Sequence, residues 1–523
     1  MKYFINNLRK EVFVSIVYAI VGIYFLQSCA VNQKTELDNS VRQKISINNG
    51  WKFFKYDSMS EADNLIYDVR PEVEEYKDGK PADSEPTDAE KIESSQKVLK
   101  PWIMPTGNEF INNPNNRYER REGNPGNDFP FVQVDFDDSK WESVNLPHDW
   151  AIKGPFFEGD NPEVGGGMGR LPSPGIAWYR KKLDIPEADS GKCIFLDVDG
   201  AMSYAMVWLN GNLVGGWPYG YTSWRVDLTS YLVPGGENQL AIRLDNPNNS
   251  SRWYPGGGLY RNVWLTKVDP VHVAHWGTYV TTENVSDESA DVNIAVTVDN
   301  MSDNKEDVKI ITKVYALNDD GSIGESSAID LDPQTVEIPA GQKVTKDNGV
   351  TIDNPKLWGP PPEQTPNMYT AVTSLYKDDE LIDQYETKFG IRSLTFDPDS
   401  GLIINGELVK IKGVNQHHDL GALGAAFNMR AAERQLEILR EMGCNAIRMS
   451  HNPPAPELLE LTDRMGFLVM DEAFDMWERK KNPLDFHLIF PEWYEQDLRA
   501  MVRRDRNNPS VIMWSYGNEV GVN

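Results

Sequence analysis

The chain has 523 residues, which is too long for one domain and favours roughly three or four domains. Its composition, 40% hydrophobic and 25% charged, is that of an ordinary globular protein. The formal net charge of -27 argues against nucleic acid or a polyanion as the partner and favours a neutral one. The sequence is also rich in tryptophan and tyrosine, whose flat faces suit sugars.

Residues 1–29 have the features of an export signal. Basic side chains near the N-terminus precede a mostly apolar run over 12–26, which is too short for a membrane span. Cys29 follows this run and resembles the lipidated cysteine of a bacterial lipobox. We therefore expect export to the periplasm or the cell surface, with Cys29 as the lipidation site of an outer-membrane lipoprotein. A plain signal peptide and an uncleaved anchor are the alternatives.

Residues 30–45 are polar and predict a tether. From 46 to 268, short alternating runs separated by Gly, Pro, Asn and Asp predict strands, and Asn210-Gly211 predicts a tight hairpin turn. Within this segment, residues 57–128 contain few apolar positions and predict a loop insertion. We interpret 46–268 as a β-sandwich of the jelly-roll type.

A second block of alternating strands runs from 269 to 393. Residues 291–300 and 308–317 alternate between apolar and polar positions, and proline-rich punctuation follows at 353–366. This pattern predicts an immunoglobulin-like sandwich. Cys193 and Cys444, which lie in apolar segments, are expected to be buried thiols.

Near residue 400 the periodicity changes, and a hairpin over 402–410 is followed by alternating strands and helices. The predicted strands are 411–415, 445–450, 467–473 and 511–519, and the predicted helices are 430–443, 456–466 and 493–507. Such alternation predicts a parallel sheet with covered faces. A complete (β/α)8 TIM barrel needs about 250 residues, so residues 394–523 predict its N-terminal half, with about four βα units.

Polar side chains follow each of these strands at its carboxyl end, where barrel active sites lie. They are His417 after the first strand, Arg448 and His451 after the second, Asp471, Glu472 and Asp475 after the third, and Asn518 and Glu519 after the fourth. Because these strand ends meet at one edge of the sheet, the residues predict a catalytic mouth. His417 and His418 are adjacent and cannot both point inward, and we favour His417.

Several of these segments resemble the signatures of family 2 glycoside hydrolases, which include β-galactosidases, β-glucuronidases and β-mannosidases. In the barrel half they are GVNQH (413–417), NAIRMSHNPP (445–454), LTDRMGFLVMDEA (461–473) and DRNNPSVIMWSYGNE (505–519). Upstream, NGWKF (49–53), NLPHDWAI (145–152) and SRWYPGGGLYRNVWL (251–265) resemble the family's sugar-binding jelly roll. The resemblance covers nearly all of 46–523, and Asn508 departs from it where the family usually has His, Arg or Tyr.

The resemblance implies retaining glycoside hydrolysis by two carboxyl groups, a general acid/base and a nucleophile. It assigns the acid/base to Glu519, whose pKa would have to be raised toward neutrality. It implies that Asn518 binds the sugar 2-hydroxyl, that Arg448 orients the nucleophile, and that His417, His451 and Arg252 contact the sugar. Asp471 is expected either to contact substrate or to be a buried partner of an arginine.

The family's nucleophile comes from the seventh strand, well downstream of Glu519, and the sequence ends four residues after that glutamate. We expect either an incomplete copy of the enzyme or a second chain that supplies the other half. Some members of the family also hold magnesium with a carboxylate just after the Asp-Glu-Ala of the third strand. Trp477 occupies that position here, so no metal or other cofactor is predicted, and Asp475 alone keeps magnesium open.

The resulting prediction is an exo-acting β-galactosidase that cleaves terminal β-D-galactose from oligosaccharides or glycans. A β-galactoside is the expected partner, a homo-oligomer and a lipid anchor are compatible with the sequence, and nucleic acid is not expected. Within the family, a β-glucuronidase is the first alternative and a β-mannosidase the second. A non-catalytic carbohydrate-binding relic and a non-functional truncated product are the alternatives outside catalysis.

Overall fold

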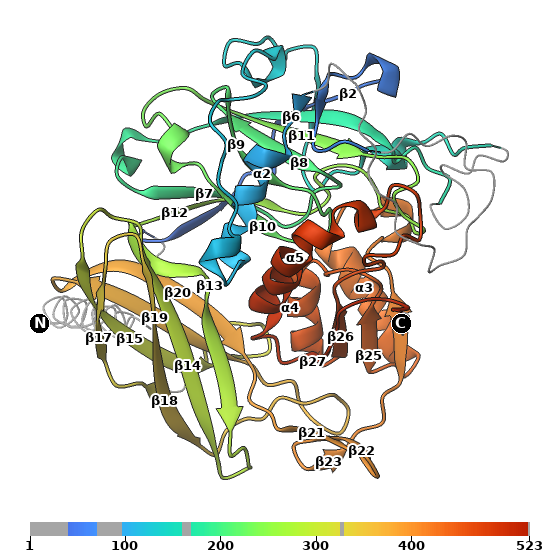
Figure 1. Cartoon of the computed structure of the whole chain (residues 1–523). Coiled ribbons are helices and arrows are strands. Elements are labelled where there is room, and N and C mark those ends of the chain that lie inside the picture. The colour runs from blue at the N-terminus through green and yellow to red at the C-terminus, as the bar shows by residue number, and fades with distance from the viewer. Residues whose placement is uncertain (1–39, 71–96, 159–168, 325–328, 521–523) are drawn as a thin grey trace, which may run out of the picture. The chain divides into compact units, whose positions relative to one another are not determined.

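A computed structural model of the chain describes residues 40–70, 97–158, 169–324 and 329–520 (Figure 1). The predicted export signal with Cys29 and most of the predicted tether lie outside these residues. In the part of the chain that the structure describes, no helix is both long and apolar enough to cross a membrane.

The N-terminal domain is built from two antiparallel sheets. One has the order β1-β12-β7-β10 and the other the order β5-β2-β6-β11-β8-β9. Their strands are β1 (Gln43–Ser46), β2 (Trp51–Lys55), β5 (Glu142–Val144), β6 (Gly175–Leu183), β7 (Cys193–Val198), β8 (Ala205–Leu209), β9 (Asn212–Trp217), β10 (Trp224–Asp227), β11 (Asn238–Asn246) and β12 (Val263–Val268). Asn210 and Gly211 both have positive φ between β8 and β9, as the predicted hairpin turn requires.

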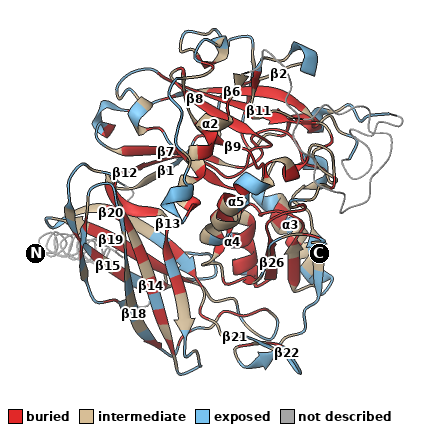
Figure 2. Cartoon of the chain, in the orientation of Figure 1, coloured by how far each residue is buried: buried red, intermediate tan, exposed pale blue. Residues whose placement is uncertain are grey.

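The core between these sheets is rich in fully buried aromatic side chains, among them Trp51, Trp178 and Trp208. Figure 2 shows that buried residues concentrate along the strands of this domain. β1 pairs with β12, so the last three residues of the predicted tether, 43–45, belong to this sheet instead. The predicted jelly-roll sandwich is confirmed as part of the fold class.

The prediction of a loop insertion over 57–128 is wrong for part of its length. β3 (Leu65–Ile66) pairs with β4 (Lys97–Val98), and α2 (Lys100–Ile103) and the 3-10 helix η2 (Met104–Phe110) follow. Ile103 and Phe110 are fully buried in the core. The apolar residues of this segment are too few and too widely spaced to produce a periodic signal, although Leu65, Ile103 and Phe110 pack in the core of the sandwich.

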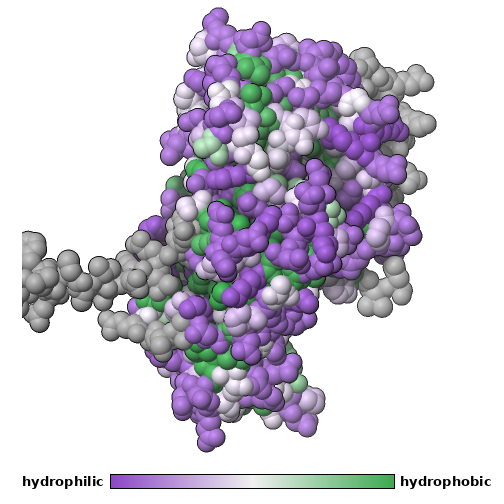
Figure 3. All heavy atoms as spheres, turned by 90° about the vertical axis from the view of Figure 1, so that its left-hand side faces the viewer, coloured by the Kyte–Doolittle hydropathy of each residue, from purple (hydrophilic) through white to green (hydrophobic). Residues whose placement is uncertain are grey.

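The second domain is the predicted immunoglobulin-like sandwich. One sheet has the order β13-β14-β18, and the other has the order β16-β15-β19-β20 with β17 also paired to β15. The strands are β13 (Val271–Glu283), β14 (Ser289–Asn300), β15 (Glu306–Ala316), β16 (Ile329–Asp330), β17 (Gln334–Ile338), β18 (Lys343–Asp353), β19 (Tyr369–Lys377) and β20 (Glu380–Phe389). Side chains of β14 alternate between buried and more exposed, so one face of its sheet packs on the core. Figure 3 shows the left-hand side of Figure 1 face-on, where most of the surface is hydrophilic.

The third domain begins with the sheet β21 (Leu394–Asp397), β22 (Gly401–Ile404) and β23 (Glu407–Leu408). A parallel sheet of order β24-β25-β26-β27 follows. Its strands and covering helices are β24 (Gly413–Gln416), α3 (Met429–Glu441), β25 (Ala446–Met449), α4 (Pro456–Met465), β26 (Leu468–Glu472), α5 (Phe490–Asp505) and β27 (Val511–Ser515). The predicted partial TIM barrel is therefore confirmed. Cys193 is buried as predicted, whereas Cys444, which lies between α3 and β25, is only half-buried.

The jelly roll and the barrel portion share one hydrophobic core. Trp217 Nε1 and Thr222 Oγ1 both donate to Oδ1 of the buried Asp497 on α5, at 2.7 and 2.8 Å. The ring of Trp217 also packs edge-on against Trp493, with ring centroids 5.0 Å apart. The immunoglobulin-like domain is attached at the start of β27, where Arg392 donates to the carbonyl oxygens of Pro509 and Val511.

We expect Trp217→Ala to lower the free energy of unfolding by about 3–5 kcal/mol, because it opens a cavity in the shared core. It also removes a donor from the buried Asp497. Urea denaturation followed by circular dichroism measures the change. Leu408→Ala, at an exposed position of β23, is the control and should change stability by no more than about 0.5 kcal/mol. Equal denaturation midpoints for the two variants would contradict the proposed role of the contact.

Candidate active site

A fully buried carboxylate, Glu472, lies at the centre of the strand ends. Arg448 Nε and Nη2 donate to its Oε2 at 2.9 and 2.7 Å, and Ser515 Oγ donates to the same oxygen at 2.7 Å. Nδ1 of His451 lies 2.7 Å from Oε1. Glu472 thus connects the carboxyl ends of β25, β26 and β27.

Burial alone would raise the pKa of Glu472, but the hydrogen bonds from His451, Ser515 and Arg448 outweigh burial. The pKa therefore lies below its ordinary value, and the group is an anion. Asp471, the neighbouring carboxylate, faces the other side of β26, because successive side chains of a strand alternate. It is fully buried, and burial together with the nearby Asp505 raises its pKa well above the ordinary range. The structure therefore does not bring Asp471 to the mouth, and the expectation that it contacts substrate is not supported.

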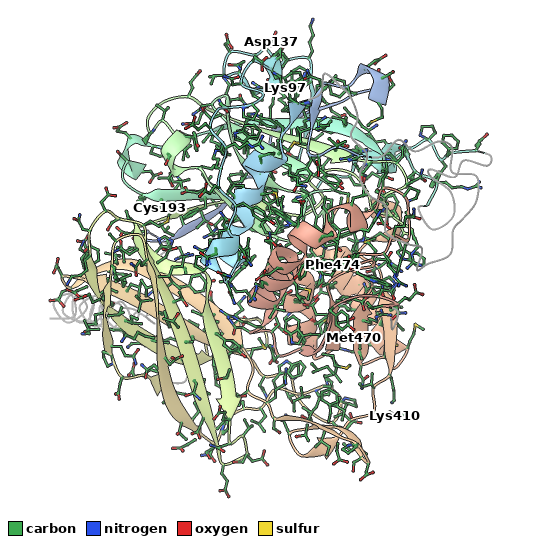
Figure 4. The ribbon with its side chains drawn as sticks, in the orientation of Figure 1. Lys97, Asp137, Cys193, Lys410, Met470 and Phe474 are labelled. Atoms are coloured by element: carbon green, nitrogen blue, oxygen red, sulfur yellow. The ribbon has the colours of Figure 1, made fainter. Side chains whose placement is uncertain are left out.

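Asn518 links this first group of residues to a second one. Arg448 Nη2 donates to its Oδ1 at 3.0 Å, and its Nδ2 donates to Oδ1 of Asp475 at 2.9 Å. Its main-chain nitrogen donates to the carbonyl of Phe474 at 2.8 Å. Figure 4 shows Phe474 and Met470 within the barrel portion. Asn518 is thus held by Arg448 of β25 and by Phe474 and Asp475 of the segment after β26.

The second group contains two carboxylates and two cations. Asp475 accepts from Arg252 Nη2 at 2.7 Å and from Lys481 Nζ at 3.3 Å. Glu519 lies 3.2 Å from each of the same two cations, measured from its Oε2 to Arg252 Nη2 and to Lys481 Nζ. Arg252 comes from the loop between β11 and β12, so the jelly roll contributes a residue to the mouth. Lys481 was missed, because it lies in a segment after β26 that carries no periodic or motif signal.

Glu519 is presented to solvent, with its side chain 56% exposed, and its φ of 53° is in the left-handed region. Slight burial would raise its pKa, but the hydrogen bond and charge of Lys481, followed by those of Arg252, lower the pKa below the ordinary value. The expected upward shift is therefore absent in this state. The sequence placed Arg252 near the sugar but did not show that Arg252 and Lys481 both lie beside Glu519.

Three rings form one side of the mouth. The ring of His417 lies 4.6 Å from that of Trp253 and 5.3 Å from that of His451, measured between centroids. His418 instead points beneath the jelly roll, where its Nε2 lies 3.2 Å from the carbonyl of Pro255. The structure therefore brings His417 to the mouth, in agreement with the choice between the two histidines. Burial and the neighbouring His451 lower the pKa of His417, which favours a neutral ring.

The residues present do not fit a magnesium site after the third strand. Asp475, the carboxylate that kept this question open, is already paired with two cations, Arg252 and Lys481. A further cation there would meet positive charge, and hard divalent metals require several free oxygen ligands.

A hollow of about 230 Å³ lies over the inner face of the parallel sheet, lined by Arg448, Met470 and Met513 among others.

Three family descriptions match successive parts of the chain. Residues 175–254 match the glycosyl hydrolase 2 galactose-binding domain-like family, 271–392 match glycosyl hydrolases family 2, and 398–523 match the TIM barrel domain of glycosyl hydrolases family 2. The three matches follow the order of the jelly roll, the immunoglobulin-like sandwich and the partial barrel.

Relatives with the same architecture carry two different names. The beta-galactosidase BoGH2A of Bacteroides ovatus is 48% identical over 396 residues, covering 76% of this chain and 45% of the relative. A putative beta-glucuronidase of Formosa agariphila is 34% identical over 415 residues, covering 77% of this chain and 38% of the relative. The chain therefore spans less than half the length of these two relatives.

Solved structures of such proteins are also similar. A glycosyl hydrolase family 2 member from Bacteroides cellulosilyticus has a TM-score of 0.68 and 37% identity, covering 74% of this chain and 49% of its own. A beta-glucuronidase of Bacteroides uniformis has a TM-score of 0.65 and 25% identity, covering 92% of this chain and 47% of its own.

We expect Glu472→Gln to lower the free energy of unfolding by about 3–5 kcal/mol near neutral pH, because it leaves the partly buried Arg448 without its anion. Since the pKa of Glu472 is lowered on folding, its stabilisation is fully present above the ordinary value of 4.5. It is lost as the pH falls through the lower folded-state pKa. Urea denaturation at several pH values should show a gap between wild type and variant that closes in acid.

Glu441→Gln is the matched control, because Glu441 is exposed at the end of α3. It should leave stability unchanged to within about 0.5 kcal/mol at every pH. A pH-independent gap for Glu472→Gln would show that packing, and not the charge of Glu472, accounts for its effect.

Proposed function

The chain belongs to glycoside hydrolase family 2, and from this membership we propose that it is part of a retaining exo-glycosidase that releases terminal β-D-galactose from oligosaccharides or glycans. The observation that carries this proposal is the exposed carboxylate of Glu519 at the end of β27, beside Asn518 and among cationic and aromatic side chains. A carboxylate so placed can exchange a proton with a glycosidic oxygen.

In the proposed reaction, Glu519 donates a proton to the leaving oxygen and later takes one from water. The second carboxylate, about 5–5.5 Å from the first in retaining enzymes, would come from a strand of the barrel beyond the described residues. Asn518 would bind the 2-hydroxyl, and its fixed amide suits this role because Arg448 and Asp475 hold both ends of it. Trp253, His417 and His451 would face the sugar ring.

Glu519 must gain a proton before it can act as an acid. In the structure its pKa is lowered by Lys481 and Arg252. A bound sugar would exclude water from Glu519 and, by contacting Arg252, would weaken one of the two ion pairs. Both changes raise the pKa of a carboxyl group. Arg252 is the more accessible cation, with 25% of its side chain exposed, whereas Lys481 is completely buried.

The choice of galactose over glucuronate rests on charge and on relatives. Within the described part of the mouth, Arg252 and Lys481 pair with Asp475 and Glu519, and Arg448 pairs with Glu472. A uronate carboxylate would have to compete with these anions, whereas a neutral sugar would not. The relative named a beta-galactosidase is also 48% identical, against 34% for the putative beta-glucuronidase. β-Glucuronidase activity remains the competing proposal within the family.

We expect Glu519→Gln in the full-length protein to lower kcat on an alkyl β-galactoside by about 10²–10⁴-fold, the usual contribution of general acid catalysis. An aryl galactoside with an acidic phenol should lose less in its first step, because its leaving group needs no proton. Glu380→Gln, on the exposed start of β20, should be neutral. Full activity of Glu519→Gln would rule out the acid/base role, and faster turnover of a β-glucuronide by wild type would replace galactose as the substrate.

We also propose export and lipid anchoring through Cys29, on the basis of the N-terminal sequence. Cys29→Ser should abolish incorporation of labelled palmitate and move the protein from the membrane fraction to the soluble one. Cys193→Ser, which changes a buried thiol in β7, is the control and should leave both unchanged. If Cys29→Ser and the wild type associated equally with the membrane and neither incorporated palmitate, an uncleaved anchor would be favoured.

A further inference from the structure

Lys481 is the most completely buried cation of the mouth. Its side chain has no exposed surface, and its Nζ donates to Oδ1 of Asp475 at 3.3 Å, to the carbonyl of Asn518 at 3.0 Å and to Oε2 of Glu519 at 3.2 Å. A buried ammonium group is stable only when its donors are satisfied by charged or strongly polar partners. All three partners belong to the mouth.

The segment that carries Lys481 is fixed to the rest of the protein. The main-chain nitrogens of Lys481 and Asn482 donate to Oδ2 of Asp485 at 2.8 and 2.6 Å. Oδ1 of Asp485 lies 2.6 Å from Nδ1 of His487, and Leu484 donates its N–H to the carbonyl of Asn249 in the jelly roll. The backbone at Lys481 is therefore anchored independently of the contact between its side chain and Glu519.

Glu519 needs such a support. A non-glycine residue in the left-handed region costs about 1–3 kcal/mol and persists only where its surroundings hold it, and Glu519 has a φ of 53°. Lys481 contacts both the carbonyl before this residue and its carboxylate, and so fixes the turn and the side chain together.

We propose that Lys481 is a positioning residue of the acid/base carboxylate: it orients Glu519 at the end of β27 and, with Arg252, sets the pH range over which that carboxylate is ionised. The expected effect on kinetics rests on the proposed function, whereas the expected effect on the position and ionisation of Glu519 does not. Among the described residues, the charged groups that face Glu519 are Arg252 from the jelly roll and Lys481, and Asp475 pairs with both cations. Arg252 is exposed enough to be displaced by substrate, and Lys481 is not.

Lys481→Met keeps most of the aliphatic stem and removes the charge. Asp475 retains Arg252 and Asn518 as partners in this variant, so the fold should survive. We expect the basic limb of the pH profile of kcat/KM to move to higher pH, because loss of a cation raises a carboxyl pKa. We expect kcat to fall by about 10- to 100-fold with a smaller change in KM, because the carboxylate is misplaced.

Lys481→Arg keeps the charge and should retain the wild-type basic limb. Lys412→Met removes a charge at an exposed position just before β24 and should leave the limb and kcat unchanged. Lys481→Gln, which retains N–H donors without a charge, serves if Lys481→Met does not fold, and it should move the limb in the same direction. A basic limb that stays in place in a folded, uncharged Lys481 variant overturns the proposal.

A titration without turnover separates this inference from the proposed function. The carboxyl carbon of Glu519, labelled with carbon-13 and assigned by its loss in Glu519→Gln, reports the pKa of the group directly. Lys481→Met should raise that pKa and Lys412→Met should not, whether or not the protein hydrolyses glycosides. An unchanged Glu519 pKa in Lys481→Met overturns the role of Lys481, whereas a wild type inactive on every glycoside overturns the proposed function alone.

Discussion

The buried carboxylate of Glu472 is the constraint on which the mouth depends. A charge that is removed from water must be paired and hydrogen-bonded. The partners of Glu472 are Arg448 at the end of β25, His451 in the turn after β25, and Ser515 at the end of β27. Satisfying this one anion therefore fixes the relative heights of β25, β26 and β27. Arg448, once oriented in this way, also holds Asn518, so the position of the last strand follows from the same interaction.

The mouth also depends on a domain that contributes no strand to the barrel. Arg252 and Trp253 extend from the jelly roll to Glu519 and His417, and their positions are useful only if the jelly roll does not move. Trp217, bonded to Asp497 on α5, and Arg261, which donates to the carbonyls of Pro453 and Pro454, attach the two domains close to this point. Both side chains are buried, and in a densely packed interior displacements are costly.

The periodic features of the sequence were sufficient to predict the domain architecture and several of the strand ends. The alternating strand and helix signals near residue 400 place His417, Arg448, His451, Asn518 and Glu519 at one edge because parallel strands end together. The site predictions that failed concerned residues whose roles depend on contacts between distant segments. Asp471 and Glu472 are chemically alike, and only the register of β26 decides that Glu472 faces the mouth. Lys481 lies in a segment without periodicity, and its importance comes from Asp475 and Asn518, which fold against it.

The missed cation changes the chemistry expected of Glu519. An acid/base carboxyl needs both protonation states during one catalytic cycle, so an environment that strongly favours either state would hinder one half of the reaction. Lys481 and Arg252 favour the anion in the open mouth, where water also stabilises it. In the proposed reaction, covering the site would remove the water, and a sugar that displaced Arg252 would remove one of the two cations, while the buried Lys481 would stay. The carboxyl can then take up a proton in the covered state without losing its position. In the proposed reaction, the buried Lys481 would therefore keep Glu519 oriented through the whole cycle, whereas the exposed Arg252 would keep it ionised only until the sugar binds.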